Sequence, residues 1–586
     1  MHDLVIRNGL VYDGLGGRPY EADIAIDGGT ITAVGKIAAG GREEIDARGQ
    51  IVTPGFVDAH THYDGQVTWD PYLAPSTMHG VTTAVMGNCG VGFAPCAGDR
   101  HDWLIGLMEG VEDIPGTALA EGIKWGWESF ADYMDVVERS PLALDVGLQV
   151  PHGAVRAYVM GERGARLEPA TPEDVRAMAR IVAEALEAGA LGFSTSRTEK
   201  HRDKNGEHTP TYKAEAMELH GIARAMGEAG GGTGKGVIQL IADFRDVDWE
   251  FAMLRGMVEL SGRPLSLTIE QDDRHPYIWR EVLDKIAEAN ADGLPVRGQV
   301  PARPTGIVMG LTASLNPFLL HKTWHEIAGR PLENQVAAMR DPDFRARLLA
   351  ENPDYKPGEI STLLFTGFHK MFPLGDTPDY EPAPETSAQA QAEREGRDPR
   401  EVLLDWLAED AGKALVYFPL MNYLPGDLSF VEEMIRHPDT AFGLSDGGAH
   451  VGIICDASFP TTFLTHWGRD RTRGPKLPLE WLIAGQTRKT AELVGLYDRG
   501  IIAPGMKADI NVIDFDRLRL HRPEIIYDLP AGGKRFIQRA DGYTASIVSG
   551  AVAFREGEPT GILGGRLVRG AQGRPANAQL PAAAAE

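Results

Sequence analysis

The chain has 586 residues and a net charge of −25, from 58 basic and 83 acidic residues. Hydrophobic residues make up 43% and charged residues 24% of it, which is typical of a globular protein with a packed core. The acidic balance and the lack of a long basic run argue against nucleic acid or an anionic membrane as the main partner. No apolar run approaches the roughly 18 residues that span a bilayer, and the start MHDLVIRNG lacks the organisation of a signal peptide, so we expect a cytoplasmic protein.

The two ends of the chain share one sequence pattern. Residues 1–50 contain short strands with glycine turns, as in VIRNGLVYDG, and the same order of strand, turn and strand returns in SIVSGAVAFREG near the other end. This pattern predicts one small β domain formed jointly by residues 1–52 and 496–570. The low-complexity tail, 571–586, is expected to be flexible.

Between the two ends, the sequence pattern predicts alternating strands, loops and helices. Thr171 and Pro172 predict a helix start, followed by apolar residues at helical spacing until Gly189. Eight buried strands are expected in all: IVTPGFVDAH, GVTTAVMG, LDVGLQV, ALGFSTS, GVIQLIADF, PLSLTIEQ, PVRGQVPAR and TAFGLSDGG. Eight such strands predict a TIM-like (β/α)8 barrel over residues 53–495, with its chemistry at the carboxyl ends of the strands. One Pro- and Ala-rich stretch within it, Gly375–Arg400, is expected to be a long surface excursion.

Polar residues follow several of the predicted strands. His60 and His62 come after the first, Cys89 after the second, His152 after the third and Asp446 after the last. Alternate side chains of a strand point the same way, which places His60 and His62 on one face, about 7 Å apart at their Cα atoms. Two imidazoles so placed can converge on one cation, and Asp446 lies next to the first strand once the barrel closes. The alternative is a pair of hydrogen-bonded histidines without a metal.

Several motifs together resemble the amidohydrolase superfamily and, within it, the N-acyl-D-amino-acid deacylases (D-aminoacylases). They cover nearly the whole chain in order: GLVYDGLG, TPGFVDAHTHYD, GVTTAVMGNCGVGFAPC, GVEDIPGTAL, VPHGAVR, GFSTS, LSDGGAH and DRGIIAPGMKADINVIDFD. The resemblance implies a metal-bearing barrel and a β-sandwich built from both ends of the chain.

The resemblance also implies roles for particular residues. His60 and His62 match metal ligands, Cys89 in GNCG matches a cysteine that binds metal as thiolate, and Asp446 matches the aspartate that binds metal and acts as general acid/base. Without the resemblance Cys89 would be taken for a buried inert thiol. The other two cysteines, Cys96 and Cys455, have no such support and are expected to be structural. The expected cofactor is one or two divalent metal ions, with zinc as the first candidate.

The sequence departs from the family at three places. The family carries histidines at the ends of its fifth and sixth strands, where this chain has GVIQLIADF and PLSLTIEQDD, and ALGFSTS offers no lysine to bridge two metals. Either one ion is held by the residues that remain, or other residues replace the missing donors. The candidates in reach are Gln239, Asp243, Glu270, His152 and His450.

We therefore predict a metal-dependent hydrolase of a linear amide bond. The favoured substrate is an N-acyl (D-)amino acid or a related small N-acyl compound. A metal ion activates water, Asp446 moves the proton, and His450 and His152 are candidates for stabilising the oxyanion. Glu270 is a further candidate for supporting the metal ligands or binding substrate. Arg197 is a candidate partner for a substrate carboxylate, with a surface salt bridge as the alternative.

Two other functions stay open at this point. The same site could act on a cyclic amide, a carbamate or an ester, because fold and metal do not choose the substrate. The chain could also be a catalytically inactive barrel that serves in assembly or binding. The partner expected is a small molecule, neither nucleic acid nor membrane, and a homo-oligomer remains open.

Overall fold

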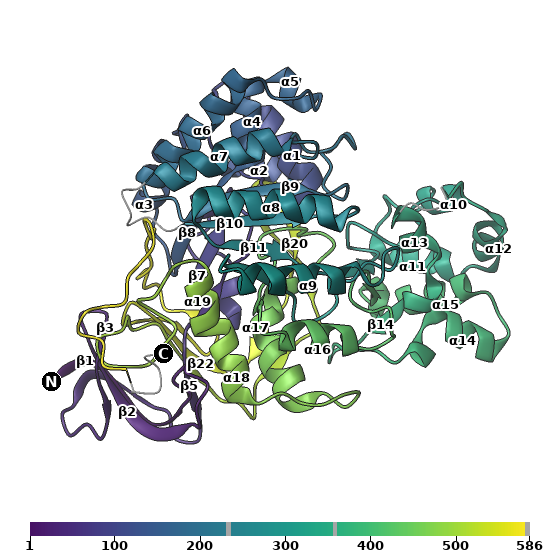
Figure 1. The fold of residues 1–586 in the computed structure, drawn as a ribbon. Helices are drawn as coiled ribbons and strands as arrows, with labels where there is room; N and C mark the ends of the chain where they lie inside the picture. The colour runs from purple at the N-terminus through teal and green to yellow at the C-terminus, as the bar shows by residue number, and fades with distance from the viewer. Residues whose placement is uncertain (230–235, 356–359, 581–586) are drawn as a thin grey trace.

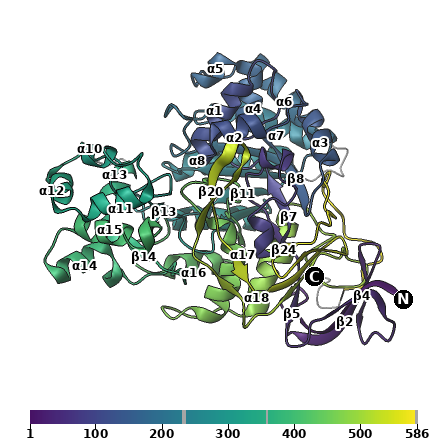
Figure 2. The same cartoon turned by 180° about the vertical axis from the view of Figure 1, so that it is seen from behind.

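The computed structural model describes residues 1–229, 236–355 and 360–580. A barrel of strands and helices occupies the centre, strands from both chain ends form a sheet on one side, and a helical lobe projects on the other (Figures 1 and 2). Among the described residues no helix is long and apolar enough to cross a bilayer.

The barrel contains the eight predicted strands, in chain order, as neighbours in one parallel sheet. The order runs β16, β12, β11, β10, β9, β8, β7, β6. The bounds are β6 Phe56–Asp58, β7 Val81–Met86, β8 Asp145–Pro151, β9 Gly192–Arg197, β10 Val237–Ala242, β11 Leu265–Thr268, β12 Val296–Val300 and β16 Thr440–Phe442. The prediction of a TIM-like barrel is confirmed.

The first and last strands meet through residues just beyond their ends. Thr61 forms a parallel bridge with Gly447, whose carbonyl oxygen accepts a hydrogen bond from the His62 amide at 2.8 Å. The Ser445 hydroxyl donates to the Asp58 carboxylate. These contacts close the barrel and bring the end of β6 against the segment that contains Asp446.

Helices cover the outside of the barrel. The predicted helix is α6, Pro172–Glu187, and its start is fixed by a capping box between Thr171 and Asp174. The other helices on this layer are α1 His101–Glu112, α2 Gly116–Gly122, α3 Phe130–Arg139, α4 His152–Met160, α5 Glu162–Ala165, α7 Ala216–Glu228, α8 Val247–Ser261, α9 Ile278–Ala291, α16 Ser429–Arg436, α17 Phe459–Thr462, α18 Leu479–Ala484 and α19 Thr490–Leu493.

The two chain ends form one β domain, as predicted. Its nine-stranded mixed sheet joins β1 His2–Val11, β2 Tyr20–Asp27, β3 Thr30–Gly35, β4 Gly41–Asp46 and β5 Ile51–Pro54 with β17 Ile510–Ile513, β22 Tyr543–Val548, β23 Ala551–Arg555 and β24 Glu558–Pro559. Buried side chains from both ends, such as Ile6, Ile26, Ile510 and Ile547, share one hydrophobic cluster.

The tail differs from the expected flexible segment over its first ten residues. Gln572 forms a bridge with Leu496, and Ala578 and Leu580 pack against the hydrophobic cluster of the β domain. Apolar side chains scattered through a low-complexity stretch were enough to dock it. Residues 581–586 lie outside the described part of the chain.

Residues 375–400, expected to be a surface excursion, instead belong to a folded lobe between β12 and β16. The lobe contains β13 Gly306–Gly310, β14 Phe372–Leu374, β15 Leu415–Pro419 and the helices α10 Lys322–His325, α11 Leu332–Arg340, α12 Pro342–Ala350, α13 Ile360–Thr366, α14 Ala388–Glu395 and α15 Pro399–Leu407. Ala388 and Ala392 of α14 are buried in its core with Trp324 and Phe418. Small side chains in a polar stretch therefore mark a close helix contact here.

A buried ion cluster joins the barrel to the β domain. Asp145, at the start of β8, lies 2.8 Å from Arg499 Nη1 and 3.2 Å from Lys507 Nζ, and its side chain is fully buried. Burial alone would raise the pKa of Asp145, but Lys507 and Arg499 lower it below its usual value.

We expect Asp145→Asn to lower the free energy of unfolding by about 3 kcal/mol, because two buried cations lose a carboxylate. Urea unfolding at neutral pH measures this, with the exposed Glu173→Gln as control, whose partner Arg176 is also exposed. The wild-type contribution is full above the unfolded pKa of about 3.9 and is lost as the pH falls from there through the lowered folded pKa. Equal stability of Asp145→Asn and wild type would contradict a linking role for this cluster.

Candidate metal centre and active site

A cavity of about 1000 Å³ opens at the carboxyl ends of the barrel strands. Its polar wall includes His60, His62, Cys89, Glu112, His201, Glu270, Asp446 and His450. Segments that are far apart in the sequence therefore converge at the end of the barrel where the sequence pattern placed the chemistry.

His60 is held in one orientation by the seventh strand. Its Nδ1 lies 2.7 Å from Gln299 Oε1, so the acceptor oxygen leaves the proton on Nδ1 and a lone pair on Nε2. That Nε2 lies 3.3 Å from Cys89 Sγ and 3.3 Å from Asp446 Oδ1. Burial lowers the pKa of His60 to about 4, so the ring is a neutral donor at physiological pH.

His62 lies beside it on the same face, with the two ring centroids 5.4 Å apart. Its Nε2 is 3.6 Å from Asp446 Oδ1, and its Nδ1 is 3.3 Å from Glu112 Oε1. Burial lowers the pKa of His62 to about 3. The His62 Nδ1 and Glu112 Oε2 atoms are buried without a hydrogen-bond partner among the described residues.

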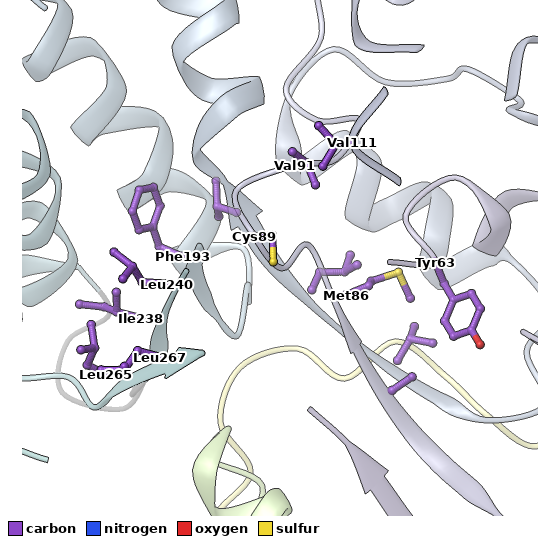
Figure 3. Close-up of a cluster of buried hydrophobic side chains, with 14 of the residues drawn as sticks. Tyr63, Met86, Cys89, Val91, Val111, Phe193, Ile238, Leu240, Leu265 and Leu267 are labelled. Atoms are coloured by element: carbon purple, nitrogen blue, oxygen red, sulfur yellow. The ribbon is translucent and has the colours of Figure 1, made fainter. Parts of the chain in front are cut away.

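Cys89 sits in a tight turn after β7. The turn needs its glycines: a Cβ on Gly87 would lie 2.2 Å from the Gln149 carbonyl oxygen, and one on Gly90 would lie 2.9 Å from the Thr195 Cα. The Cys89 amide donates to Gln239 Oε1 at 2.8 Å, which fixes the turn against the fifth strand. Figure 3 shows Cys89 within the buried cluster that also holds Met86, Val91 and Leu240.

The electrostatics of this group call for a positive charge. Burial, followed by the charges of Asp446, Glu112 and Glu270, raises the pKa of the Cys89 thiol well above its usual value. Burial also raises the pKa of Asp446, and raises that of Glu112 with help from the Asp446 charge. The Asp446 and Glu112 carboxyl groups and the Cys89 thiol can all ionise together only if a cation offsets their repulsion.

The donor atoms of His60, His62 and Cys89 all lie within 4.8 Å of one another. No second group of this kind occurs within residues 1–229, 236–355 and 360–580. Two imidazole nitrogens, one sulfur and the adjacent carboxylate of Asp446 form a donor set that suits zinc or a similar ion. The residues present therefore fit one divalent metal.

The other candidate ligands divide into two groups. Glu270 and His450 line the cavity, with Glu270 accepting a 2.5 Å hydrogen bond from Thr305 and His450 Nε2 3.7 Å from Glu112. Gln239 instead supports the Cys89 turn, and Asp243 accepts hydrogen bonds from Thr198 Oγ1 and the Glu199 amide. Neither Gln239 nor Asp243 lines the cavity.

Two predicted residues lie outside the cavity lining. Both ring nitrogens of His152 are engaged, one 2.9 Å from Thr195 Oγ1 and the other 2.9 Å from Glu218 Oε1. Arg197 pairs with Glu250 at 3.2 Å and also donates to the Ala214 carbonyl. Their strand-end positions suggested the cavity, but partners on neighbouring helices and loops turn both side chains away from it.

Three residues of the site were missed. Glu112 is the glutamate of the quoted GVEDIPG motif, which was the available signal for it. His201 follows the fourth strand by only four residues, a spacing like that of His60 and His62 after the first. Gln299 lies within a strand and carries no sequence signal, because its role depends on a contact with His60 across 239 positions.

Comparison with known proteins shows the family. The model of the amidohydrolase family matches residues 43–554, so the chain belongs to this family. An uncharacterized protein of Mycobacterium tuberculosis is 26% identical, over 95% of this chain and 92% of its own length. The N-acyl-D-glutamate deacylase of Alcaligenes xylosoxydans xylosoxydans is 36% identical over 39% of this chain and 42% of its own length.

Solved structures agree on the fold. A crystal structure of D-aminoacylase superposes with a TM-score of 0.63 at 22% identity, over 97% of this chain and 100% of that one. The N-acyl-D-glutamate deacylase of Bordetella bronchiseptica, complexed with zinc and a phosphonate inhibitor, has a TM-score of 0.62 at 23% identity over 97% and 99%. The family and the deacylase relatives make this protein a hydrolase that acts on carbon–nitrogen bonds.

The placement of His152 generates a test. We expect Glu218→Gln to lower the free energy of unfolding by about 3 kcal/mol, because Arg156 loses a buried carboxylate 2.8 Å away, while metal content stays unchanged. Urea unfolding and elemental mass spectrometry measure the two quantities. Loss of metal at unchanged stability would instead place His152 and Glu218 in the functional site.

Proposed function

We propose that the protein is a metal-dependent amidase that hydrolyses the amide bond of N-acyl-D-amino acids. The observation that carries the proposal is the convergence of His60, His62 and Cys89 within 4.8 Å, beside Asp446, in a cavity of about 1000 Å³. Such a cavity accommodates a small N-acyl compound. The Alcaligenes relative, an N-acyl-D-glutamate deacylase, supports both the linear amide and the D configuration.

The same four residues are the proposed ligands, as His60 Nε2, His62 Nε2, the Cys89 thiolate and the Asp446 carboxylate. We propose one zinc ion, because the described residues hold one donor group and the Bordetella deacylase forms a complex with zinc. A bound divalent ion supplies Lewis acidity, which lowers the pKa of a nearby water and polarises the scissile carbonyl.

The protein groups have distinct tasks around that ion. Gln299 keeps the His60 proton on Nδ1, so that Nε2 faces the cavity as a donor. Glu112 Oε1 lies 3.3 Å from His62 Nδ1 and is the acidic neighbour of the second imidazole. The turn held by Gln239 presents the Cys89 sulfur toward His60 Nε2.

Asp446 is the proposed general base and acid. It lines the cavity within 3.6 Å of both histidines, so one of its oxygens can accept the proton of the attacking water and return it to the leaving nitrogen. In the metal-free protein, burial raises the pKa of this carboxyl, and a bound cation would favour its ionised form. Its single carboxylate thus serves both halves of the reaction.

We expect the purified protein to carry about one zinc per chain and to hydrolyse N-acyl-D-amino acids at least tenfold faster than the L forms. Elemental mass spectrometry and release of the free amino acid measure these. Activity should vanish on chelation and return with zinc. Turnover of hydantoins, carbamates or esters with none of N-acyl-D-amino acids would move the assignment to those substrates, and a metal-free protein inactive on all of them would indicate a non-catalytic barrel.

Cys89→Ser is expected to weaken metal binding by more than the roughly 10- to 100-fold typical of losing a residue that only supports a ligand. In the cobalt-substituted protein it should also remove the thiolate-to-cobalt charge-transfer absorption. Cys96→Ser is the matched control, because Cys96 is also buried but lies outside the donor group, its thiol donating to the Ala97 carbonyl. Retention of the absorption band in Cys89→Ser would exclude the sulfur from the ligand set.

A further inference from the structure

The loop after the fourth strand carries an imidazole into the cavity. His201 lines the cavity together with His60, His62 and Asp446. The loop is held from outside: Asp243 accepts from Thr198 Oγ1 at 2.5 Å and from the Glu199 amide at 2.9 Å, and Glu199 pairs with Arg274 at 2.8 Å. His201 is therefore a fixed part of the wall rather than the tip of a loose loop.

The contact with Ser196 determines which nitrogen carries the proton. His201 Nδ1 lies 3.0 Å from Ser196 Oγ, and the buried hydroxyl has no other acceptor among the described residues. A buried hydroxyl donates its proton where an acceptor is available, so Nδ1 accepts it. The ring proton is then on Nε2, which has no hydrogen-bond partner among the described residues.

The surroundings keep this ring neutral. Burial, followed by the positive charges that His450, His62 and Lys200 can carry, lowers the pKa of His201 well below its usual value. A neutral imidazole with its proton on a fixed nitrogen is a hydrogen-bond donor that polarises a carbonyl without being consumed as an acid.

We propose that His201 is a further catalytic residue of the amide hydrolysis proposed above, on which this inference rests. Its Nε2–H donates a hydrogen bond to the oxygen of the scissile carbonyl, and this bond strengthens as the oxygen gains negative charge in the tetrahedral transition state. No proton is transferred in this step; the proton stays on His201 throughout.

The other cavity groups are less suited to this task. His450 Nε2 faces Glu112 at 3.7 Å, and Lys200 Nζ faces Glu270 at 3.8 Å, so both have a carboxylate as neighbour. His60, His62, Cys89 and Asp446 are already assigned to the proposed metal centre. His201 therefore remains available for the substrate.

The test compares His201→Ala with His201→Gln, which retains a side-chain N–H, and with His208→Ala as control. His208 is in the same loop but stacks on Tyr212 with ring centroids 4.1 Å apart, and it does not line the cavity. The measurements are zinc content, kcat and KM for the best N-acyl-D-amino acid, and the affinity of a phosphonate analogue in which a tetrahedral phosphorus replaces the carbonyl carbon.

We expect His201→Ala to lower kcat by about 100- to 1000-fold, with little change in KM and none in zinc content. The phosphonate should bind more weakly by a similar factor, because it mimics the tetrahedral charge. His201→Gln should recover at least tenfold over His201→Ala, and His208→Ala should match wild type.

Loss of zinc in His201→Ala would make the residue a ligand and overturn the proposal. Unchanged kcat, or reduced kcat with unchanged phosphonate affinity, would overturn it as well. Failure of the underlying function is distinguishable, because the wild-type protein itself would then turn over none of the N-acyl-D-amino acids.

Discussion

The site depends on closure of the barrel between its first and eighth strands. The Ser445 hydroxyl bonds to Asp58, and Thr61 pairs with Gly447, so the residues on either side are locked together. His60 and His62 follow one strand and Asp446 follows the other, and these two strands are the two edges of the eight-stranded sheet. A few contacts just beyond the strand ends therefore assemble residues nearly 400 positions apart, since Ser445 and Asp58 differ by 387.

The assembled group is built against its own electrostatics. Burial favours the neutral forms of Cys89, Glu112 and Asp446, and their mutual repulsion adds to this preference. The supporting contacts nevertheless aim their lone pairs inward: Gln299 acts on His60, and Gln239 acts on the Cys89 turn. A protein that holds acids and imidazoles in this arrangement obtains a large stabilisation from a cation, and metal binding must release the thiol proton.

Much of the fold was readable from the sequence because local patterns determine it. Short continuous apolar runs predicted all eight barrel strands. Thr171 and Pro172 predicted a helix start that the capping box confirms. Residues 375–400 were not recognised as part of the lobe because this polar stretch contributes only small core residues such as Ala388, which pack beside large side chains from other segments such as Trp324. His152 and Arg197 were placed correctly on the backbone, but side-chain direction depends on Glu218 and Glu250, which no local pattern reveals. Gln299 depends on a contact of the same long-range kind, whereas His201 lies four residues after β9 and contacts Ser196, five residues away.

The departures from the deacylase pattern have a physical explanation in the positions that changed. At the end of the fifth strand, where the family resemblance implies a histidine, the Gln239 side-chain oxygen accepts a hydrogen bond from the Cys89 amide and so fixes the turn that carries a proposed ligand. Beyond the sixth strand, Glu270 bonds to Thr305 and faces Lys200 across the cavity. A strand end that loses a ligand can thus keep its importance by fixing the turn that carries another. An imidazole that the barrel lacks on those strands is present on the loop after the fourth, where His201 contacts Ser196 and lines the cavity, and its proposed role is toward the substrate.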